Sequence, residues 1–486
     1  MEKENKLLNY IKTNKEYIIL SVIILIAFIL RVYKISSPSL WHDELMTFYR
    51  LQGSFSDTLT TLLISPFPPL YYILMKFWTN IFGFSEFALR FPSAIFSTLT
   101  IPYLYLLTKK LFNKKTALIS SFLLAIFPYA INYAQEAKMY SMVWFLSIAS
   151  FYHFLNFIEN PDRRNIILYT IFTTLMIYTL YFGFLILITQ LTCFLLYQKR
   201  KPIKEMIIVL LSIILLYIPW IRIASQNISH KSGIEWVLKT NNYFSAIKEI
   251  FSDIFRTNTS LELTIYTILI LSGIIALFLI KENKDKNNFW KKKSILLLTF
   301  LPLILMMLID RFSTPILVTR YVGFIHLPLI ILIALTINYT NKWNKYLPII
   351  ILAILTISTF TIHLMPYYEK QLKIEGEDWR SFFNETCNEI NNKTLIINGI
   401  SSPEKILHYY GACLPKVIIP ALFITDIPSD KLTANYSYEK LIFLSRLAPQ
   451  ATLQLRDLKN NTKDRYYLNK TIQEGSLKAN ILKRIN

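Results

Sequence analysis

The stretch YIILSVIILIAFILRVYKISSPSLWHDEL, residues 17–45, decides the fold class. It opens with an apolar run from Tyr17 to Val32, close to the roughly 20 residues that a helix needs to cross a bilayer. It ends in the pentad Trp41–Leu45, which contains Asp43 and Glu44. Two adjacent carboxylates are costly near lipid but are tolerated at a water-facing site. The stretch therefore predicts a membrane protein with an acidic site at the membrane surface.

Apolar runs of spanning length recur along the whole chain. The protein has 486 residues, of which 53% are hydrophobic and 10 are glycine. This pattern predicts a mainly α, polytopic membrane protein of about eleven transmembrane helices. The first run has no small-residue cleavage site, so we expect it to remain as a helix and not to be a signal peptide. The expected helices are 16–33, 84–108, 116–134, 139–158, 164–181, 183–198, 204–220, 261–280, 294–309, 319–340 and 346–365.

The apolar run 65–82 differs from the others because it contains Pro66, Pro68 and Pro69. Proline interrupts a helix, so we predict a helix lying at the membrane interface and not a span. Its aromatic side chains, Tyr71 and Tyr72 among them, suit binding at such an interface.

Short basic loops set the predicted orientation. They follow every second expected helix, and the positive-inside rule makes their side cytoplasmic. The amino terminus is then inside, and residues 34–83, 221–260 and everything after about 365 are outside. The net charge of +21 is explained by these loops, which attract anionic membrane lipids, and no nucleic-acid partner is expected. The basic residues include Lys109, Lys110, Arg163, Arg164, Lys199, Arg200, Lys201, Lys281, Lys284, Lys342 and Lys345.

Residues 366–486 are expected to form a small soluble α/β domain outside the membrane, with 1–365 as the transmembrane domain. Short strands are predicted at 394–398, 416–419 and 441–444, and a helix at 402–410.

The chain has three cysteines, of which Cys193 is expected to pack inside a helix bundle. Cys387 and Cys413 both fall in the predicted outer domain, where oxidation is permitted. Either a disulfide or two buried thiols fits this placement. No cysteine and histidine pattern has the spacing of metal ligands, so neither a metal nor another cofactor is predicted.

Several polar clusters fall on the outer face in this topology. A carboxylate there can accept a proton from an attacking hydroxyl, and cations can neutralise a departing phosphate. Each cluster also has a simpler explanation: loop charges in water, a local Glu136–Lys138 ion pair, arginines extending to the interface, or tyrosines of an aromatic belt. The candidates are Asp43, Glu44, Arg90, Glu136, Lys138, Arg320 and Tyr321, with Tyr71 and Tyr72 from the proline-rich run.

Taken in order, these stretches resemble the GT-C glycosyltransferases, particularly the protein mannosyltransferases that use dolichyl-phosphate-mannose and the aminoarabinose transferase. The similar segments are Ser39-Leu-Trp-His-Asp-Glu-Leu-Met-Thr47, Pro68-Pro-Leu-Tyr-Tyr72, Phe82-Gly-Phe-Ser-Glu-Phe-Ala-Leu-Arg-Phe-Pro92, Tyr133-Ala-Gln-Glu-Ala-Lys-Met-Tyr140, Pro315 with Arg320-Tyr321, and Asp378-Trp-Arg380.

The resemblance implies a GT-C-type bundle in the cell membrane and a polyprenyl-phosphate sugar donor. It implies that Asp43 activates or orients the acceptor, that Glu44 orients Asp43 or substrate, and that Lys138 and Arg320 hold the lipid phosphate. The acceptor, whether lipid, glycan or protein, stays open. Two positions depart from the family pattern: Phe67 stands where many relatives have His or Lys, and Lys138 where Arg is common. Lysine keeps the charge but loses the two-pronged geometry of arginine.

Other functions also fit a polytopic protein with outer charges. A flippase or transporter of lipid-linked saccharides is one, although no inverted repeat is visible. An oligosaccharide polymerase is another, but it would not need the terminal domain. A non-catalytic scaffold is the third, and the retained Asp43 and Glu44 argue against it.

Overall fold

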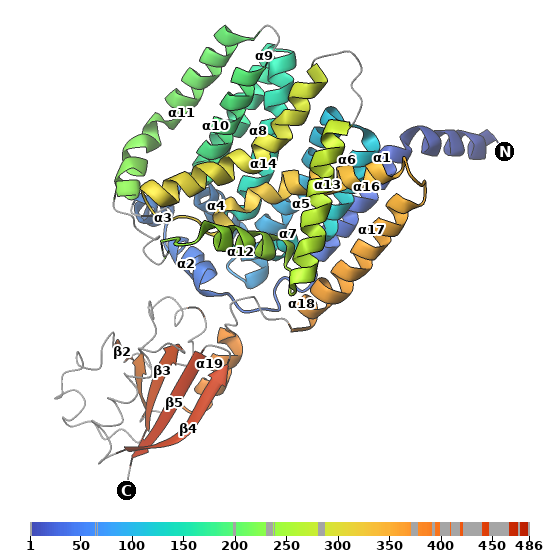
Figure 1. The fold of residues 1–486 in the computed structure, drawn as a ribbon. Helices are drawn as coiled ribbons and strands as arrows, with labels where there is room; N and C mark the ends of the chain where they lie inside the picture. The colour runs from blue at the N-terminus through green and yellow to red at the C-terminus, as the bar shows by residue number, and fades with distance from the viewer. Residues whose placement is uncertain are drawn as a thin grey trace. The chain divides into compact units, whose positions relative to one another are not determined.

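A computed structural model shows a mainly helical protein (Figure 1). It describes residues 2–63, 65, 67–197, 201–229, 237, 239–279, 287–370 and 378–390. In the C-terminal region it describes 394–398, 409, 418–420, 440–446, 466–474 and 477–484. Contacts divide the chain into two compact units: unit 1 comprises 1–35 and 50–366, and unit 2 comprises 36–49 and 367–486.

The long helices of unit 1 follow the predicted spans closely. They are α1 (Glu2–Val32), α5 (Glu86–Leu111), α8 (Tyr140–Glu159), α9 (Arg163–Thr179), α10 (Gly183–Leu196), α11 (Ile203–Ser229), α13 (Ser260–Leu279), α14 (Asn287–Phe312), α16 (His326–Thr340) and α17 (Leu347–Ser358). Before α16 come α15 (Thr319–Val322) and the 3-10 turn η1 (Gly323–Ile325). After α17 come the π-helix η2 (Thr359–Leu364) and α18 (Met365–Lys370).

In the described part of the chain, seven helices are long and apolar enough to cross a membrane. The pair α6 (Lys114–Ile126) and α7 (Pro128–Ala134) makes up to eight if it counts as one broken span. The other three predicted spans are helices too, but α9 has 17 residues, α10 has 14, and the apolar part of α1, residues 17–32, is short and contains Arg31. The predicted fold class, a mainly α polytopic bundle, is confirmed.

The expected helix 116–134 is bent by 56° between α6 and α7. Pro128 begins α7 and lacks the N–H that would bind the carbonyl of Leu124. The fully buried Arg31 of α1 fills this role, because its guanidinium donates to the carbonyls of Leu124 (3.1 Å) and Ala125 (2.9 Å). The break is therefore satisfied by a side chain from another helix.

Four short amphipathic helices lie in the segments that were expected to be outer loops. They are α2 (His42–Arg50), α3 (Phe55–Leu63), α4 (Leu70–Phe82) and α12 (Tyr243–Phe255). The sequence predicts α4, although it begins later than the apolar run 65–82. With 13 residues it is about 20 Å long, too short to span the hydrocarbon.

Unit 2 contains a five-stranded mixed sheet in the order β2-β1-β3-β5-β4. The parallel strands are β1 (Thr394–Asn398), β2 (Ile418–Pro420) and β3 (Lys440–Arg446), close to the three predicted strands. The antiparallel strands β4 (Tyr466–Glu474) and β5 (Leu477–Arg484) were not predicted. The helix α19 (Trp379–Cys387) packs against β4 and β5 (Figure 1).

Two predicted features of unit 2 fall largely outside the described residues. Of the predicted helix 402–410, only Tyr409 is described, and it is helical. Cys387 is disulfide-bonded, and Cys413 lies outside the described residues. Cys193 is a free, buried thiol in α10.

Candidate functional site

The nine candidate residues are divided between the two units. Asp43 and Glu44 lie in the first turn of α2 and belong to unit 2. The remaining candidates belong to unit 1: Tyr71, Tyr72, Arg90, Glu136, Lys138, Arg320 and Tyr321.

The two acids of α2 differ in their surroundings. Glu44 is fully buried, and its Oε2 accepts a hydrogen bond from the main-chain N–H of Trp41 (3.2 Å). Trp41 is the residue before the helix and Glu44 is the third residue inside it, so this bond is the glutamate half of a capping box. Asp43 is half-buried. Both charges also gain from the dipole at the start of the helix. The geometry thus fits Glu44 as the residue that orients the helix turn carrying Asp43.

Lys138 is a buried cation of unit 1. Its residue is 2% exposed, and its Nζ lies 5.4 Å from the centre of the Phe67 ring. Among the residues that the structure describes, this ammonium has no ion pair and no hydrogen bond. A buried charge normally needs a partner, because desolvation costs several kcal/mol. The local ion pair with Glu136, an alternative that the sequence left open, does not occur among the described residues. The Lys138 ammonium can therefore bind an anion.

A second cation, Arg50 at the end of α2, shares the same aromatic ring. Its Cζ lies 5.9 Å from the ring centre of Phe67 and 5.4 Å from that of Tyr72. Its Nη1 also donates a long hydrogen bond of 3.5 Å to the Tyr72 hydroxyl. In the described chain Arg50 has no carboxylate partner either. Arg50 and Lys138 thus lie against the same Phe67 ring. Arg50 was not predicted from the sequence, because it stands at the end of an unpredicted helix.

The loop that carries Lys138 is fixed by hydrogen bonds from side chains to main-chain carbonyls. Gln135 donates from Nε2 to the carbonyls of Arg31 (3.1 Å) and Tyr33 (2.9 Å), which joins the loop to the end of α1. Ser93 of α5 donates to the carbonyl of Lys138 itself (3.2 Å). The position of Lys138 is therefore determined by two neighbouring helices and not by its side chain.

Arg90 and Tyr71 are buried within unit 1. Arg90 is fully buried and donates from Nη1 to the carbonyl of Ile35 (2.7 Å), which holds the chain where it leaves α1. Tyr71 packs edge-to-face on Tyr72, with ring centres 5.5 Å apart. These contacts position backbone and rings. A role for either residue in binding substrate stays a prediction.

The hydroxyl of Tyr133 lies within electrostatic range of a second group of charges. The charges of Glu136, Arg256 and Arg320 all act on this hydroxyl. Glu136 is 7% exposed, and its Oε1 accepts from Asn132 (3.4 Å). Two of the predicted residues, Glu136 and Arg320, thus lie within electrostatic range of the same hydroxyl.

Arg256 was not predicted. It ends α12 in the left-handed conformation (φ 54°), and its Cζ lies 5.9 Å from the ring centre of Tyr129. A non-glycine residue with positive φ is uncommon and marks a backbone held by its surroundings. The sequence signal for this site was a single arginine before the predicted helix 261–280, at the end of the unpredicted α12, which is too weak to find.

The turn that carries Arg320 is fixed from both sides. Asp310 of α14 accepts from the N–H groups of Ile316 (2.9 Å) and Leu317 (3.1 Å) before the turn. Thr319 donates to Asp253 of α12 (2.7 Å), and its own carbonyl accepts from the Tyr129 hydroxyl (3.1 Å).

Tyr321 and Tyr243 complete this region. Tyr321 is buried with its ring 4.9 Å from that of Phe182. Tyr243 of α12 donates to the Asp310 carboxylate (3.0 Å). Desolvation, followed by this hydrogen bond, raises the pKa of Tyr243, so the hydroxyl stays protonated and keeps donating.

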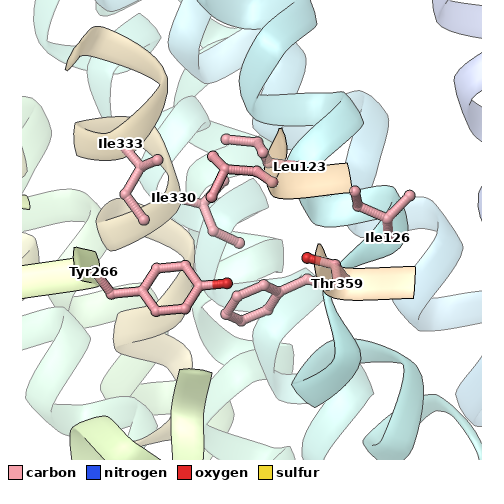
Figure 2. A pocket seen from close by; sticks show the side chains of 8 residues that line it. Leu123, Ile126, Tyr266, Ile330, Ile333 and Thr359 are labelled. Atoms are coloured by element: carbon pink, nitrogen blue, oxygen red, sulfur yellow. The ribbon is translucent and has the colours of Figure 1, made fainter. Parts of the chain in front are cut away.

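No group of three or more His, Cys, Asp or Glu residues in the described chain is arranged to hold a metal ion. A small apolar cavity lies elsewhere in unit 1, between α6, α13, α16 and the start of η2 (Figure 2). The hydroxyls of Tyr266 and Thr359 face it, and its volume is about 20 Å³, room for about one water molecule. It is too small for a sugar or a lipid chain.

Comparisons with known proteins agree with the resemblance seen in the sequence motifs. The family model described as dolichyl-phosphate-mannose-protein mannosyltransferase matches residues 67–222. A comparison of the sequence with curated proteins finds no match.

Solved structures share the fold at low identity. ArnT from Cupriavidus metallidurans in the apo state aligns over 97% of this chain and 98% of its own, with 9% identity and a TM-score of 0.63. The same ArnT bound to undecaprenyl phosphate aligns over 95% and 97%, with 9% identity and a TM-score of 0.57.

The archaeal oligosaccharyltransferase AglB from Archaeoglobus fulgidus, in complex with an inhibitory peptide and a dolichol-phosphate, is also similar. It aligns over 89% of this chain and 70% of its own, with 14% identity and a TM-score of 0.54. The matched family segment and these structures confirm the resemblance seen in the motifs: the chain has the fold of the GT-C glycosyltransferases.

Proposed function

We propose that this protein is a membrane glycosyltransferase that moves one sugar from a polyprenyl-phosphate donor to an acceptor hydroxyl or similar group. The observation that carries the proposal is Lys138, a buried ammonium that lies against an aromatic ring with no anionic partner in the described chain. A lipid-linked phosphate supplies the missing negative charge. The fold shared with ArnT bound to undecaprenyl phosphate supports the same ligand class.

In this proposal the acids and cations have separate roles. Asp43 accepts the proton of the acceptor as the acceptor oxygen attacks the anomeric carbon of the sugar. The bond between that carbon and the phosphate oxygen breaks, and its electron pair leaves with the phosphate. Lys138 and Arg320 stabilise the charge that develops there, and Arg50 and Arg256 are further cations suited to this role. Attack opposite the leaving group inverts the configuration at the sugar.

The membrane setting of the proposal follows from the loops. The basic loops support a cytoplasmic amino terminus and a reaction on the extracytoplasmic face of the cell membrane, as the positive-inside rule predicts. Residues 1–365 then act as the catalytic membrane domain, and 366–486 as an extracytoplasmic domain. The donor is already lipid-linked, so no nucleotide sugar is needed.

The test is sugar transfer by purified full-length protein in lipid nanodiscs. Radiolabelled polyprenyl-phosphate sugars serve as donors, and a membrane extract supplies acceptors. Wild type is expected to move label to a new product, and Asp43→Asn to lose roughly 10²–10⁴-fold in rate because it lacks the base. Lys138→Met is expected to lose on the order of 10²–10³-fold, as when one stabilising donor is removed.

Lys345→Met is the matched control for Lys138→Met. Lys345 also lies over an aromatic ring, 4.9 Å from the centre of Tyr346, but it is exposed. This variant is expected to keep the wild-type rate. An Asp43→Asn protein that folds and transfers sugar normally would contradict the central role of Asp43. A wild-type protein that moves the donor across a vesicle membrane and transfers no sugar would instead indicate a flippase.

A further inference from the structure

The first turn of α19 is capped by two residues, the adjacent Asp378 and one far away in the sequence. Asp378 precedes the helix, and its carboxylate accepts from the N–H (3.1 Å) and hydroxyl (2.8 Å) of Ser381. The first N–H groups of a helix have no partner inside it and need one from outside. The N–H of Trp379 finds this partner in the hydroxyl of Ser39, 340 residues earlier in the chain (3.1 Å). Both residues are buried, so the bond is shielded from water.

The next residue of α19, Arg380, binds main-chain carbonyls of the same segment. Arg380 donates from Nη1 to the carbonyl of Ser37 (3.1 Å) and from Nη2 to the carbonyl of Ser36 (3.3 Å). The rigid fork of a guanidinium suits two neighbouring acceptors, and one ammonium cannot reproduce that geometry. Three consecutive contacts from the start of α19 therefore fix residues 36–39.

The other end of this segment is also in contact with the C-terminal part of the chain. Phe48, near the end of α2, packs edge-to-face on Tyr409, with ring centres 4.8 Å apart. Contacts over the whole chain place 36–49 in the same compact unit as 367–486. Asp43 lies between the two held points, four residues after Ser39.

We propose that Arg380 is a positioning residue for Asp43, and that the C-terminal unit thereby forms part of the catalytic machinery. This inference rests on the proposed function of Asp43 as the base. Arg380 holds the carbonyls of Ser36 and Ser37, which precede α2. The hydrogen bond between Trp41 and Glu44 then connects this segment to the helical turn that carries Asp43. A base displaced by about 1 Å from its working position loses up to about 100-fold in rate.

Two measurements on the full-length protein in nanodiscs test this proposal. The first is steady-state transfer, which separates kcat from the KM for donor. Arg380→Gln is expected to lower kcat by about 10–100-fold and to leave the donor KM within about twofold, because the donor cations are elsewhere in the chain. Arg380→Lys is expected to recover part of the loss, since it keeps the charge without the fork. A normal kcat for Arg380→Gln would overturn the proposal.

The second measurement is amide hydrogen exchange of residues 36–49, which needs no substrate. Arg380→Gln is expected to speed exchange there, and unchanged exchange would refute the proposed contact. Lys470→Gln is the control, because Lys470 also belongs to unit 2 and forms an exposed ion pair with Glu389 (3.1 Å). It is expected to match wild type in both kcat and exchange.

A milder variant keeps the test decisive if Arg380→Gln fails to fold. Ser39→Ala removes the hydroxyl that accepts from the Trp379 N–H and leaves Arg380 in place, so it is expected to shift kcat and exchange in the same direction by a smaller factor. A Ser39→Ala protein with wild-type kcat and exchange would count against the proposal. If Asp43→Asn keeps its activity, the proposed function fails, and the exchange result still decides whether Arg380 fixes the segment.

Discussion

Replacing Gly323 with alanine tests how the turn that carries Arg320 is held. Gly323 has an ordinary helical φ of −51°, so alanine meets no backbone strain there. Its new Cβ would lie 2.4 Å from the Tyr129 hydroxyl oxygen and 2.8 Å from Cζ2 of Trp144. Ordinary contact begins near 3.5 Å, so the two gaps fall short by about 1 Å and 0.7 Å.

The two aromatic rings cannot move aside easily. Tyr129 stacks on Trp144 with centres 5.3 Å apart, and Trp144 packs on His326 at 4.5 Å. Overpacking of this kind costs about 1–3 kcal/mol of unfolding free energy. The turn is expected to shift, because the Tyr129 hydroxyl also donates to Thr319. Transfer activity should then fall by more than the loss of folded protein explains, since Arg320 follows Thr319 directly.

Thermal unfolding in detergent and transfer rates in nanodiscs would measure both effects. Gly183→Ala is the matched control, because its Cβ would lie 3.0 Å from Cγ of Met176 and 3.1 Å from the main-chain oxygen of the same residue, a smaller overlap that should cost less. Tyr129→Phe removes the nearest atom at the price of about 1 kcal/mol for the lost hydrogen bond. The double variant with Gly323→Ala should then be more stable than the single losses predict. A stable, fully active Gly323→Ala protein, or additive losses, would refute this account of the packing.

Three further predictions concern other parts of unit 1. Gly273→Ala should cost about 3 kcal/mol or more in thermal unfolding, because its Cβ would lie 2.2 Å from the main-chain oxygen of Leu332, which side-chain motion cannot relieve; an unchanged midpoint would contradict this. Phe67→Leu should weaken polyprenyl-phosphate binding by about 3–30-fold, as expected for losing a ring under two cations; unchanged affinity in a binding titration would argue against the role of the ring. Hydrogen bonds from the Ser54 N–H and then from its hydroxyl lower the pKa of Asp57. The stabilisation of α3 by the Asp57 carboxylate should therefore be complete above about pH 4 and be lost as the pH falls through the pKa of Asp57 in the folded protein. Exchange of amides 55–63 that does not depend on pH, after correction for intrinsic rates, would exclude this.

The membrane helices were predictable because hydrophobicity alone decides them. The apolar length of a span is set by the bilayer, so predicted spans such as 139–158 and 319–340 lie within a residue or two of helical segments. Short interfacial helices carry no such signal. In α2 four of nine residues are apolar and in α12 eight of thirteen, with charged residues between them, so neither forms a continuous apolar run and both segments were predicted to be loops. The bend at Pro128 was missed as well, because its acceptable geometry depends on Arg31.

The sequence cannot separate an arginine that binds substrate from one that binds backbone. Arg31, Arg90 and Arg380 each donate to main-chain carbonyls, at a helix break, at a helix exit and at the lead-in to α2. Whether a carbonyl needs such a donor depends on where the local hydrogen-bonding pattern stops, which is a property of the folded chain. Lys138 differs because its charge meets only the Phe67 ring in the described structure. The contrast separates two kinds of cation in this protein: an arginine that donates to main-chain carbonyls holds the scaffold, and a buried cation without an acceptor among the described residues is the place to look for the phosphate.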